Sequence, residues 1–222
     1  MSKLLRGFIL AVLGSMALSA NAAPVFSAST ITGDASILNT GTVIAANNLG
    51  GGAQAVTVNG ISFGNSAAGL SNWANGGGDF SNDPFSANLD ALLSSLVFVP
   101  NGSPATLTIG GLTIGQSYNL QLLFSNDLNS TGNDISVTVQ GSSYQLLNWI
   151  PSALDLSVDF VADSTSVVTT FFGGSASEPQ RPVLNGYVLQ TASATVPEPA
   201  SLGLLALGLG ALGFARRKTA KQ

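Results

Sequence analysis

Residues 118–125 read YNLQLLFS, and this stretch decides the expected fold class. Every second residue from Tyr118 to Phe124 is apolar, whereas Asn119, Gln121 and Ser125 are polar. A period of two is typical of a β-strand that buries one face and exposes the other. The same alternation recurs at 135–140 and 156–163, so the sequence predicts a protein built mainly from strands.

A β-hairpin is predicted in the first third of the chain. The strands Val56–Val58 and Ile61–Phe63 flank Asn59-Gly60, a dipeptide that suits a type I′ turn. Further strands are expected at 43–47, 97–99, 105–109, 143–147, 167–172 and 183–190. Short strands separated by turn residues predict an all-β fold, an antiparallel β-sandwich of a jelly-roll-like kind.

One short helix is expected among these strands. Ser86 is a suitable N-cap, and it is followed at helical spacing by Leu89, Leu92, Leu93 and Leu96. The glycine-rich stretch before the helix, residues 72–83, is expected to be a long loop. Long loops on sandwiches carry binding residues more often than the strands do.

The composition excludes several kinds of chemistry. The 222 residues include no cysteine and no histidine, so disulfides, thiol nucleophiles and Ser-His-Asp triads are excluded. Between residues 24 and 196 one basic residue, Arg181, stands against ten acidic residues, a net charge of −9. Nucleic acid binding requires a basic surface, so nucleic acid is not an expected partner. Neutral sugars and cations are compatible with this charge.

The N-terminus has the features of a signal peptide. Lys3 and Arg6 precede an apolar run at 8–18, and Ala20-Asn21-Ala22 matches a small-residue cleavage site. We therefore expect residues 1–22 to be a signal helix that directs export and that signal peptidase removes. The alternative is a signal anchor that remains uncut.

The C-terminus combines three features in a fixed order. Pro197-Glu198-Pro199 is followed by an uncharged run rich in leucine, glycine and alanine at 200–215, and then by Arg216-Arg217-Lys218. An apolar helix that ends in a basic cluster is typical of a transmembrane helix whose end faces the cytoplasm. The sequence thus predicts a linker at 191–196, a transmembrane helix at 200–215 and a cytoplasmic end at 219–222.

This tail resembles the PEP-CTERM sorting signal of Gram-negative bacteria over residues 197–218. The resemblance implies processing near the Pro-Glu-Pro sequence by an exosortase, an integral-membrane cysteine transpeptidase-like enzyme. It also implies an inner-membrane-anchored precursor whose mature form is released, or attached at the cell surface or in the extracellular matrix. Such proteins accompany exopolysaccharide production. An ordinary single-pass membrane anchor is the alternative.

The region between the two terminal segments, residues 23–190, is the expected sandwich domain. Its stretches LTIGGLTIGQSY at 107–118 and VLNGYVL at 183–189 resemble sequences of jelly-roll sandwiches, including galactose-binding-like modules. A strand followed by a Gly-Leu-x-x-Gly-x-x-Tyr corner also occurs in fibronectin-type sandwiches. The resemblance therefore implies a sandwich and carries over no sugar-binding residue.

A polar loop between two expected strands is the candidate metal site. Asp127, Asn129 and Thr131 match the opening of an EF-hand-like Ca²⁺ loop, and Asp134 lies further along it. The position that would close the loop is Thr138, which supplies no carboxylate. The residues therefore predict at most weak Ca²⁺ binding, and no other cofactor is expected. The alternative is a connecting loop in which Asn and Asp form local turns.

Two tryptophans are the candidate sugar-binding residues. Trp73 lies near Asn75 and Asp79, and Trp149 is the second aromatic candidate. An indole ring offers apolar area to a ligand, and Asn and Asp offer hydrogen-bond partners. The alternative for both tryptophans is a place in the core.

These features predict an exported, non-catalytic protein of the cell surface or extracellular matrix that binds polysaccharide or matrix proteins. The expected partners are signal peptidase, the export machinery, exosortase, exopolysaccharide and, through the C-terminal helix before processing, the membrane. One alternative is a purely structural or adhesive matrix component. The other is a glycan hydrolase that uses carboxylates alone. The spacing of the acidic residues identifies no catalytic pair, so no catalytic residue is predicted.

Overall fold

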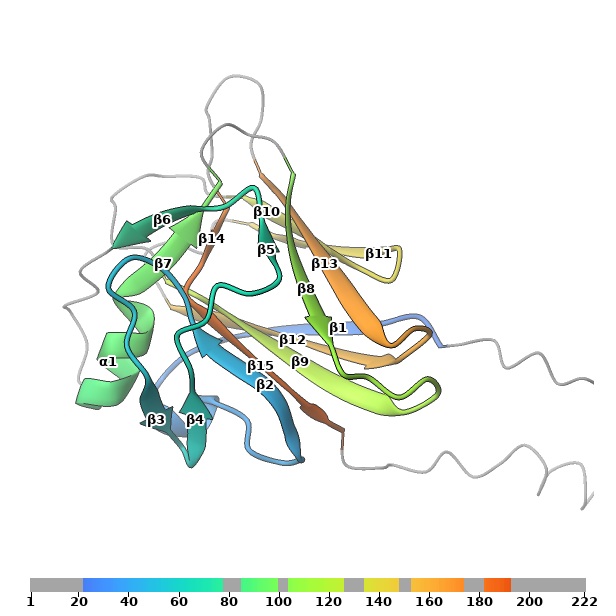
Figure 1. Ribbon diagram of the computed structural model, residues 1–222, viewed down its shortest axis with the longest axis horizontal. Coiled ribbons are helices and arrows are strands. Elements are labelled where there is room, and N and C mark those ends of the chain that lie inside the picture. Colours follow the sequence, from blue (N-terminus) through green and yellow to red (C-terminus); the bar gives the residue numbers. More distant parts are fainter. Residues whose placement is uncertain are drawn as a thin grey trace, which may run out of the picture.

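Two five-stranded sheets form the body of the computed structural model (Figure 1), which describes residues 22–77, 85–99, 104–125, 134–147, 153–173 and 182–192. The first sheet has the order β1 (Val25–Thr30), β12 (Leu154–Val161), β9 (Ser117–Phe124), β15 (Gly186–Thr191) and β2 (Val43–Asn48). The second sheet has the order β11 (Ser142–Leu146), β10 (Ile135–Val139), β13 (Ser166–Gly173), β8 (Ala105–Gly110) and β5 (Leu70–Ser71). All neighbouring strands within these two sheets are antiparallel, as predicted.

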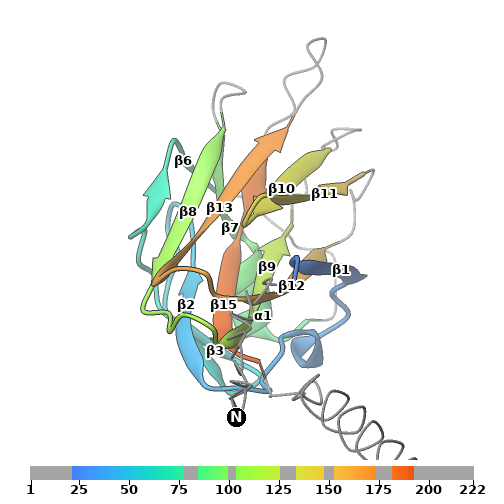
Figure 2. The ribbon, with the colours of Figure 1, turned by 90° about the vertical axis from the view of Figure 1, so that its right-hand side faces the viewer.

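The main core lies between the two sheets. The chain passes from β8 in the second sheet to β9 in the first and back to β10, so consecutive strands face one another. Figure 2 shows β8, β13, β10 and β11 side by side in the second sheet. The core includes Leu120, Leu122, Val137, Val158 and Phe171, all buried. The period of two in the sequence thus marks the inward residues of both sheets, and a sandwich of two layers results.

A third layer covers the outer face of the first sheet. It consists of the 3-10 helix η1 (Asp34–Ser36), the hairpin of β3 (Val56–Val58) and β4 (Ile61–Phe63), and α1 (Ala87–Leu93). A second buried cluster joins this layer to Leu123 and Val188 of the sheet. The layer therefore gives the first sheet two buried faces.

The predicted hairpin and the predicted helix cap are both confirmed. Asn59 and Gly60 have φ angles of 46° and 77°, the left-handed values that a type I′ turn requires. The Ser86 hydroxyl accepts a hydrogen bond from the Leu89 backbone N–H at 3.2 Å. The helix ends at Leu93, and Leu96, which shares the helical spacing, belongs to the following strand β7 (Ser95–Phe98).

The expectation that β9 exposes its polar side is wrong. Gln121 is 0% exposed, because η1 and the segment after it lie over its side chain, and Asn119 is 7% exposed. The Gln121 amide accepts from the Leu38 backbone N–H at 3.0 Å and donates to the Ser36 carbonyl at 2.7 Å. Gln190 of β15 makes the same kind of contact, accepting from the backbone N–H groups of Thr40 and Gly41. The segment after η1 is therefore held on the first sheet by hydrogen bonds to the buried side-chain amides of Gln121 and Gln190.

A small third sheet lies along the chain between strands of the two large sheets, because β6 (Ala74–Gly77) follows β5 of the second sheet and β14 (Val183–Leu184) precedes β15 of the first sheet. It has the order β14, β7 and β6. Two predictions made from the sequence are wrong in this region. The stretch 72–83 is not one long loop, because β6 pairs with β7. The strand expected at 183–190 is divided at Asn185, and β15 continues to Thr191, the first residue of the predicted linker.

The two terminal helices expected from the sequence lie outside the described residues. Within the described ranges, α1 and η1 are the helices, and neither is long and apolar enough to cross a membrane.

Candidate functional site

Among the described residues, the outer face of the second sheet is an uncharged strand surface that the third layer does not cover. We call it the open face. Its outward residues are half-buried or exposed: Thr106, Thr108, Ser136, Thr138, Ser143, Gln145, Val168, Thr170 and Phe172. The strands β8, β10, β11 and β13 contain no charged residue, although the region 24–196 carries a net charge of −9. Hydroxyls, one amide and two apolar side chains therefore form the surface.

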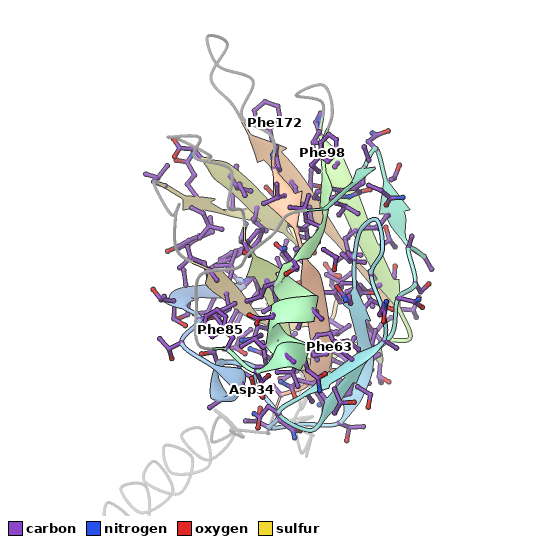
Figure 3. The ribbon with its side chains drawn as sticks, turned by 90° about the vertical axis from the view of Figure 1, so that its left-hand side faces the viewer. Asp34, Phe63, Phe85, Phe98 and Phe172 are labelled. Atoms are coloured by element: carbon purple, nitrogen blue, oxygen red, sulfur yellow. The ribbon has the colours of Figure 1, made fainter. Side chains whose placement is uncertain are left out.

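Phe172 is the main apolar feature of the open face. Its side chain is 47% exposed and extends from the end of β13, at the opposite end of the molecule from Asp34 (Figure 3). Its neighbours follow from the strand register, which places Phe172 opposite Ser136 and Ser136 opposite Gln145. Residues paired in this way lie about 5 Å apart across the strands. A phenyl ring, a hydroxyl and an amide thus lie in one row.

A shallow groove follows this row at the loop end of the open face. It has a volume of about 250 Å³ and is lined by Asp134, Ile135, Ser136, Gln145, Leu147, Phe172 and Gly173. Leu147 is 57% exposed, so apolar area flanks the polar groups on both sides. Asp134 brings a carboxylate to the groove directly before β10. Carboxylate, amide and hydroxyl groups bind ligand hydroxyls, and the phenyl ring offers a flat apolar surface.

The predicted residue Trp73 lies beside the main core. Its indole N–H donates to the Thr106 carbonyl at 2.8 Å, and its ring meets Phe171 edge-on with ring centroids 5.1 Å apart. The side chain is half-buried, as the alternative of a core position requires. Its polar edge is used inside the fold, so any ligand would meet only the remaining ring surface.

Of the other candidate sugar residues, the structure describes only Asn75. Asn75 belongs to β6 and is paired with Val97 of β7. Asp79 and Trp149 lie outside the described residues. The described residues therefore do not test the four as one site, and their role in sugar binding stays a prediction.

The candidate Ca²⁺ loop falls mainly outside the description. Asp127, Asn129 and Thr131 are not described, whereas Asp134 lines the groove beside Phe172. The described part of the chain holds no group of three or more Asp or Glu residues that could bind a metal ion. Weak Ca²⁺ binding by the loop stays a prediction.

The sequence held a signal for Phe172 that the strand prediction did not use. Phe171 and Phe172 are consecutive residues of one strand, and successive side chains of a strand point to opposite faces. Phe171 is fully buried in the core, so its neighbour must face outward. Two adjacent phenylalanines in a half-buried strand therefore predict one exposed ring.

The comparison with protein families concerns the C-terminus. Residues 195–218 match the PEP-CTERM protein-sorting motif. The chain carries a PEP-CTERM sorting motif. All six predicted sorting residues, Pro197, Glu198, Pro199, Arg216, Arg217 and Lys218, lie within the matched range. The motif indicates an exported, membrane-anchored precursor that is targeted to exosortase.

Solved structures resemble the described domain in fold. The ANX1 ectodomain from Arabidopsis thaliana has a TM-score of 0.55 at 14% identity, over 68% of this chain and 42% of that chain. The plant receptor-like kinase FER has a TM-score of 0.53 at 18% identity, over 68% of this chain and 43% of that chain. FER also occurs in a complex of the plant peptide RALF23 with FER and LLG2, which matches at a TM-score of 0.52 and 14% identity, over 75% of this chain and 55% of that chain.

The chain therefore spans about half the length of these structures, and the likeness shows the fold alone. No curated protein sequence matches the chain.

Proposed function

We propose that the mature sandwich domain is a non-catalytic module of the cell surface or extracellular matrix that binds neutral polysaccharide through its open face. Export and sorting bring the domain to the place where exopolysaccharide is found. The observation that supports this proposal is the uncharged open face with the exposed ring of Phe172. In the proposal, the groove beside Phe172 holds one sugar unit and the rows of hydroxyls contact its neighbours.

The net negative charge of the domain favours neutral polysaccharides over acidic ones as ligands. Between residues 24 and 196, Arg181 is the only basic residue, so the domain repels polyanions over most of its surface. A neutral polymer meets no such repulsion at a surface of hydroxyls and amides. We therefore expect neutral chains to bind more tightly than uronic acid polymers.

The binding energy of Phe172 follows from its exposed area. About 47% of a ring side chain of roughly 200 Å² is exposed, and covering it contributes about 2 kcal/mol at ~25 cal/mol per Å². Partial coverage by a sugar ring leaves at least about half of this, so Phe172→Ala is expected to weaken binding roughly tenfold.

The test uses the mature protein secreted by the producing strain and neutral exopolysaccharide purified from the same strain. Binding is measured by isothermal titration calorimetry with and without a Ca²⁺ chelator. Ile114→Ala is the matched control, because Ile114 is 64% exposed in the turn between β8 and β9, at the end of β8 remote from Phe172. Saturable binding that Phe172→Ala weakens and Ile114→Ala leaves unchanged supports the proposal.

Three outcomes contradict the proposal. Absence of binding in both conditions favours a structural or adhesive matrix component. Equal losses in the two variants place the contact away from the open face. Release of reducing ends from the polysaccharide during incubation reveals a hydrolase instead of a binding module.

A further inference from the structure

A pocket at one edge of the first sheet is lined by a residue whose buried side-chain oxygen has no hydrogen-bond partner among the described residues. The pocket has a volume of about 370 Å³, and its lining includes Val25, where β1 begins, and Ala192, which follows the last residue of β15. Its polar lining includes Asn119 of β9 and Asp159 of β12, which are paired across the first sheet. The Asn119 Oδ1 atom is buried and has no hydrogen-bond partner among the described residues.

The orientation of the Asn119 amide is determined by its neighbour. Asn119 Nδ2 donates to Asp159 Oδ1 at 2.9 Å, and a carboxylate accepts but does not donate. The amide oxygen must therefore point away from Asp159, and leaving a buried acceptor unpaired costs about 1–3 kcal/mol. Asn119 and Asp159 together present acceptors and one negative charge, so the pocket suits a cationic donor.

The mature domain offers very few cations for this role. Between residues 23 and 196 the only basic side chain is that of Arg181, and there is no lysine. Cleavage after Ala22 adds one more cation, the α-ammonium group of Ala23. Ala22 and Ala23 both line the pocket, and Val25, two residues later, is the register partner of Asp159.

We propose that the α-ammonium group created at Ala23 by signal peptidase binds in this pocket to Asp159 and Asn119. The inference rests on cleavage after Ala22 and is independent of the polysaccharide proposal. Before cleavage, the nitrogen of Ala23 is an amide with one N–H and no charge, and Ala22 takes up part of the pocket. After cleavage, Ala22 is gone and the nitrogen carries three N–H donors and a positive charge. Processing thus supplies the partner that Asn119 Oδ1 lacks.

The chemical consequence is a protected N-terminus. A nearby carboxylate favours the charged form of an amine and raises the pKa of the Ala23 α-amine. Only the neutral amine reacts with acylating reagents, so binding in the pocket slows its acetylation. Between residues 23 and 196 the α-amine is the only primary amine, because the lysines occur at positions 3, 218 and 221.

The experiment measures the acetylation rate of the N-terminal peptide by mass spectrometry in the secreted mature protein at pH 7. Asp159→Asn keeps the side-chain shape and removes the charge, and it is expected to raise the rate roughly fivefold. Asp163→Asn is the matched control, because Asp163 is exposed, accepts a hydrogen bond from Gln140 and does not line the pocket. Asn119→Ala is a second variant, expected to raise the rate without a change of charge.

The results separate the alternatives. A faster rate in the two pocket variants and an unchanged rate in Asp163→Asn support the proposal. Equal rates in the wild-type protein and Asp159→Asn overturn it. An N-terminal peptide that begins at any residue other than Ala23 also overturns it, because the ammonium group is then formed elsewhere.

Discussion

Replacing Asn185 by aspartate tests the polar contacts that join the third layer to the sandwich. Asn185 lies between β14 and β15 and is 0% exposed. Its Nδ2 atom donates to the carbonyl oxygens of Leu93 at 2.6 Å and Ser95 at 2.8 Å, and its Oδ1 atom accepts from the Ser125 backbone N–H at 2.6 Å. Asn185→Asp keeps the acceptor and replaces the double donor by an oxygen.

The magnitude follows from the loss of that donor. An ionised carboxylate opposite two carbonyl oxygens in a buried site is strongly unfavourable, so the new carboxyl group takes up a proton on folding. Holding a carboxyl protonated about three pH units above its ordinary titration point costs roughly 4 kcal/mol at pH 7. The protonated group regains one donor, and the second carbonyl left unpaired adds about 1 kcal/mol. The total, about 5 kcal/mol, is a large part of the 5–15 kcal/mol stability that is usual for a domain.

The sign of the pH dependence is the sharper test. The folded variant binds more protons than its unfolded chain above about pH 4, so its free energy of unfolding falls as the pH rises from 4 to 7. Urea unfolding of the mature protein at several pH values measures the deficit of Asn185→Asp against the wild type at each pH. We expect about 1–2 kcal/mol at pH 4 and about 5 kcal/mol at pH 7.

Asn88→Asp serves as the control for this substitution. Asn88 is exposed and lies in the first turn of α1, and its side-chain amide donates one hydrogen bond to the Thr57 carbonyl oxygen. The substitution should therefore change the free energy of unfolding by no more than about 0.5 kcal/mol. A deficit for Asn185→Asp that is below about 1 kcal/mol at pH 7, or equal at pH 4 and pH 7, would refute the reasoning.

Three further substitutions have defined outcomes. Trp73→Phe removes the N–H donor to the Thr106 carbonyl while keeping an aromatic ring beside the core, so thermal unfolding should show a loss of about 1–2 kcal/mol; an unchanged midpoint would contradict that contact. Gly50→Ala should lower the free energy of unfolding, measured in urea, by more than about 2 kcal/mol, because Gly50 has a φ of 115° and an added Cβ would collide with the Leu96 backbone. A folded variant of equal stability would rule out this collision. Burial raises the pKa of Tyr187, so the folded state keeps the phenol protonated and the free energy of unfolding falls above about pH 10. Tyr187→Phe should make this alkaline fall less steep. An unaltered slope would show that the Tyr187 phenol does not cause the fall.

The parts of the fold that sequence predicts well depend on short-range geometry. The hairpin at Asn59-Gly60 and the N-cap at Ser86 are both present, because turn type and capping are decided by a few neighbouring residues. The inward residues of β9 also follow from local alternation. Each of these predictions needed no knowledge of which strands become neighbours.

The burial of polar residues was not predictable in the same way. Gln121 and Asn119 have the pattern of a solvent-exposed strand face, and both are buried: η1 and the segment after it lie over Gln121, and Asn119 donates to Asp159 on the neighbouring strand. Asn185 likewise resembles a turn residue, and its three hydrogen bonds reach residues 60 to 92 positions away in the chain. Buried amides are acceptable only where partners of this kind are present, and the partners are decided by the tertiary structure.

The candidate site shows the same division. The sequence suggested Trp73 and Asn75 as neighbours of one loop, whereas the structure places Asn75 in β6 and turns the Trp73 N–H toward Thr106. The row of Phe172, Ser136 and Gln145 joins three strands that are separated in the chain. These three residues are far apart in the sequence, so no short stretch of it predicts the row. The adjacent residues Phe171 and Phe172 predict only that one of the two rings faces outward.

The sequence by itself determined the sorting of this protein and its strand-rich character. Both are encoded in contiguous residues, since a sorting motif is recognised as a linear segment and a strand is recognised by its period of two. Tertiary structure decided which sheet face is covered, which polar groups are buried, and which residues meet in the groove and in the N-terminal pocket. These properties depend on pairing between distant strands, and that pairing is selected by the packing of the whole domain.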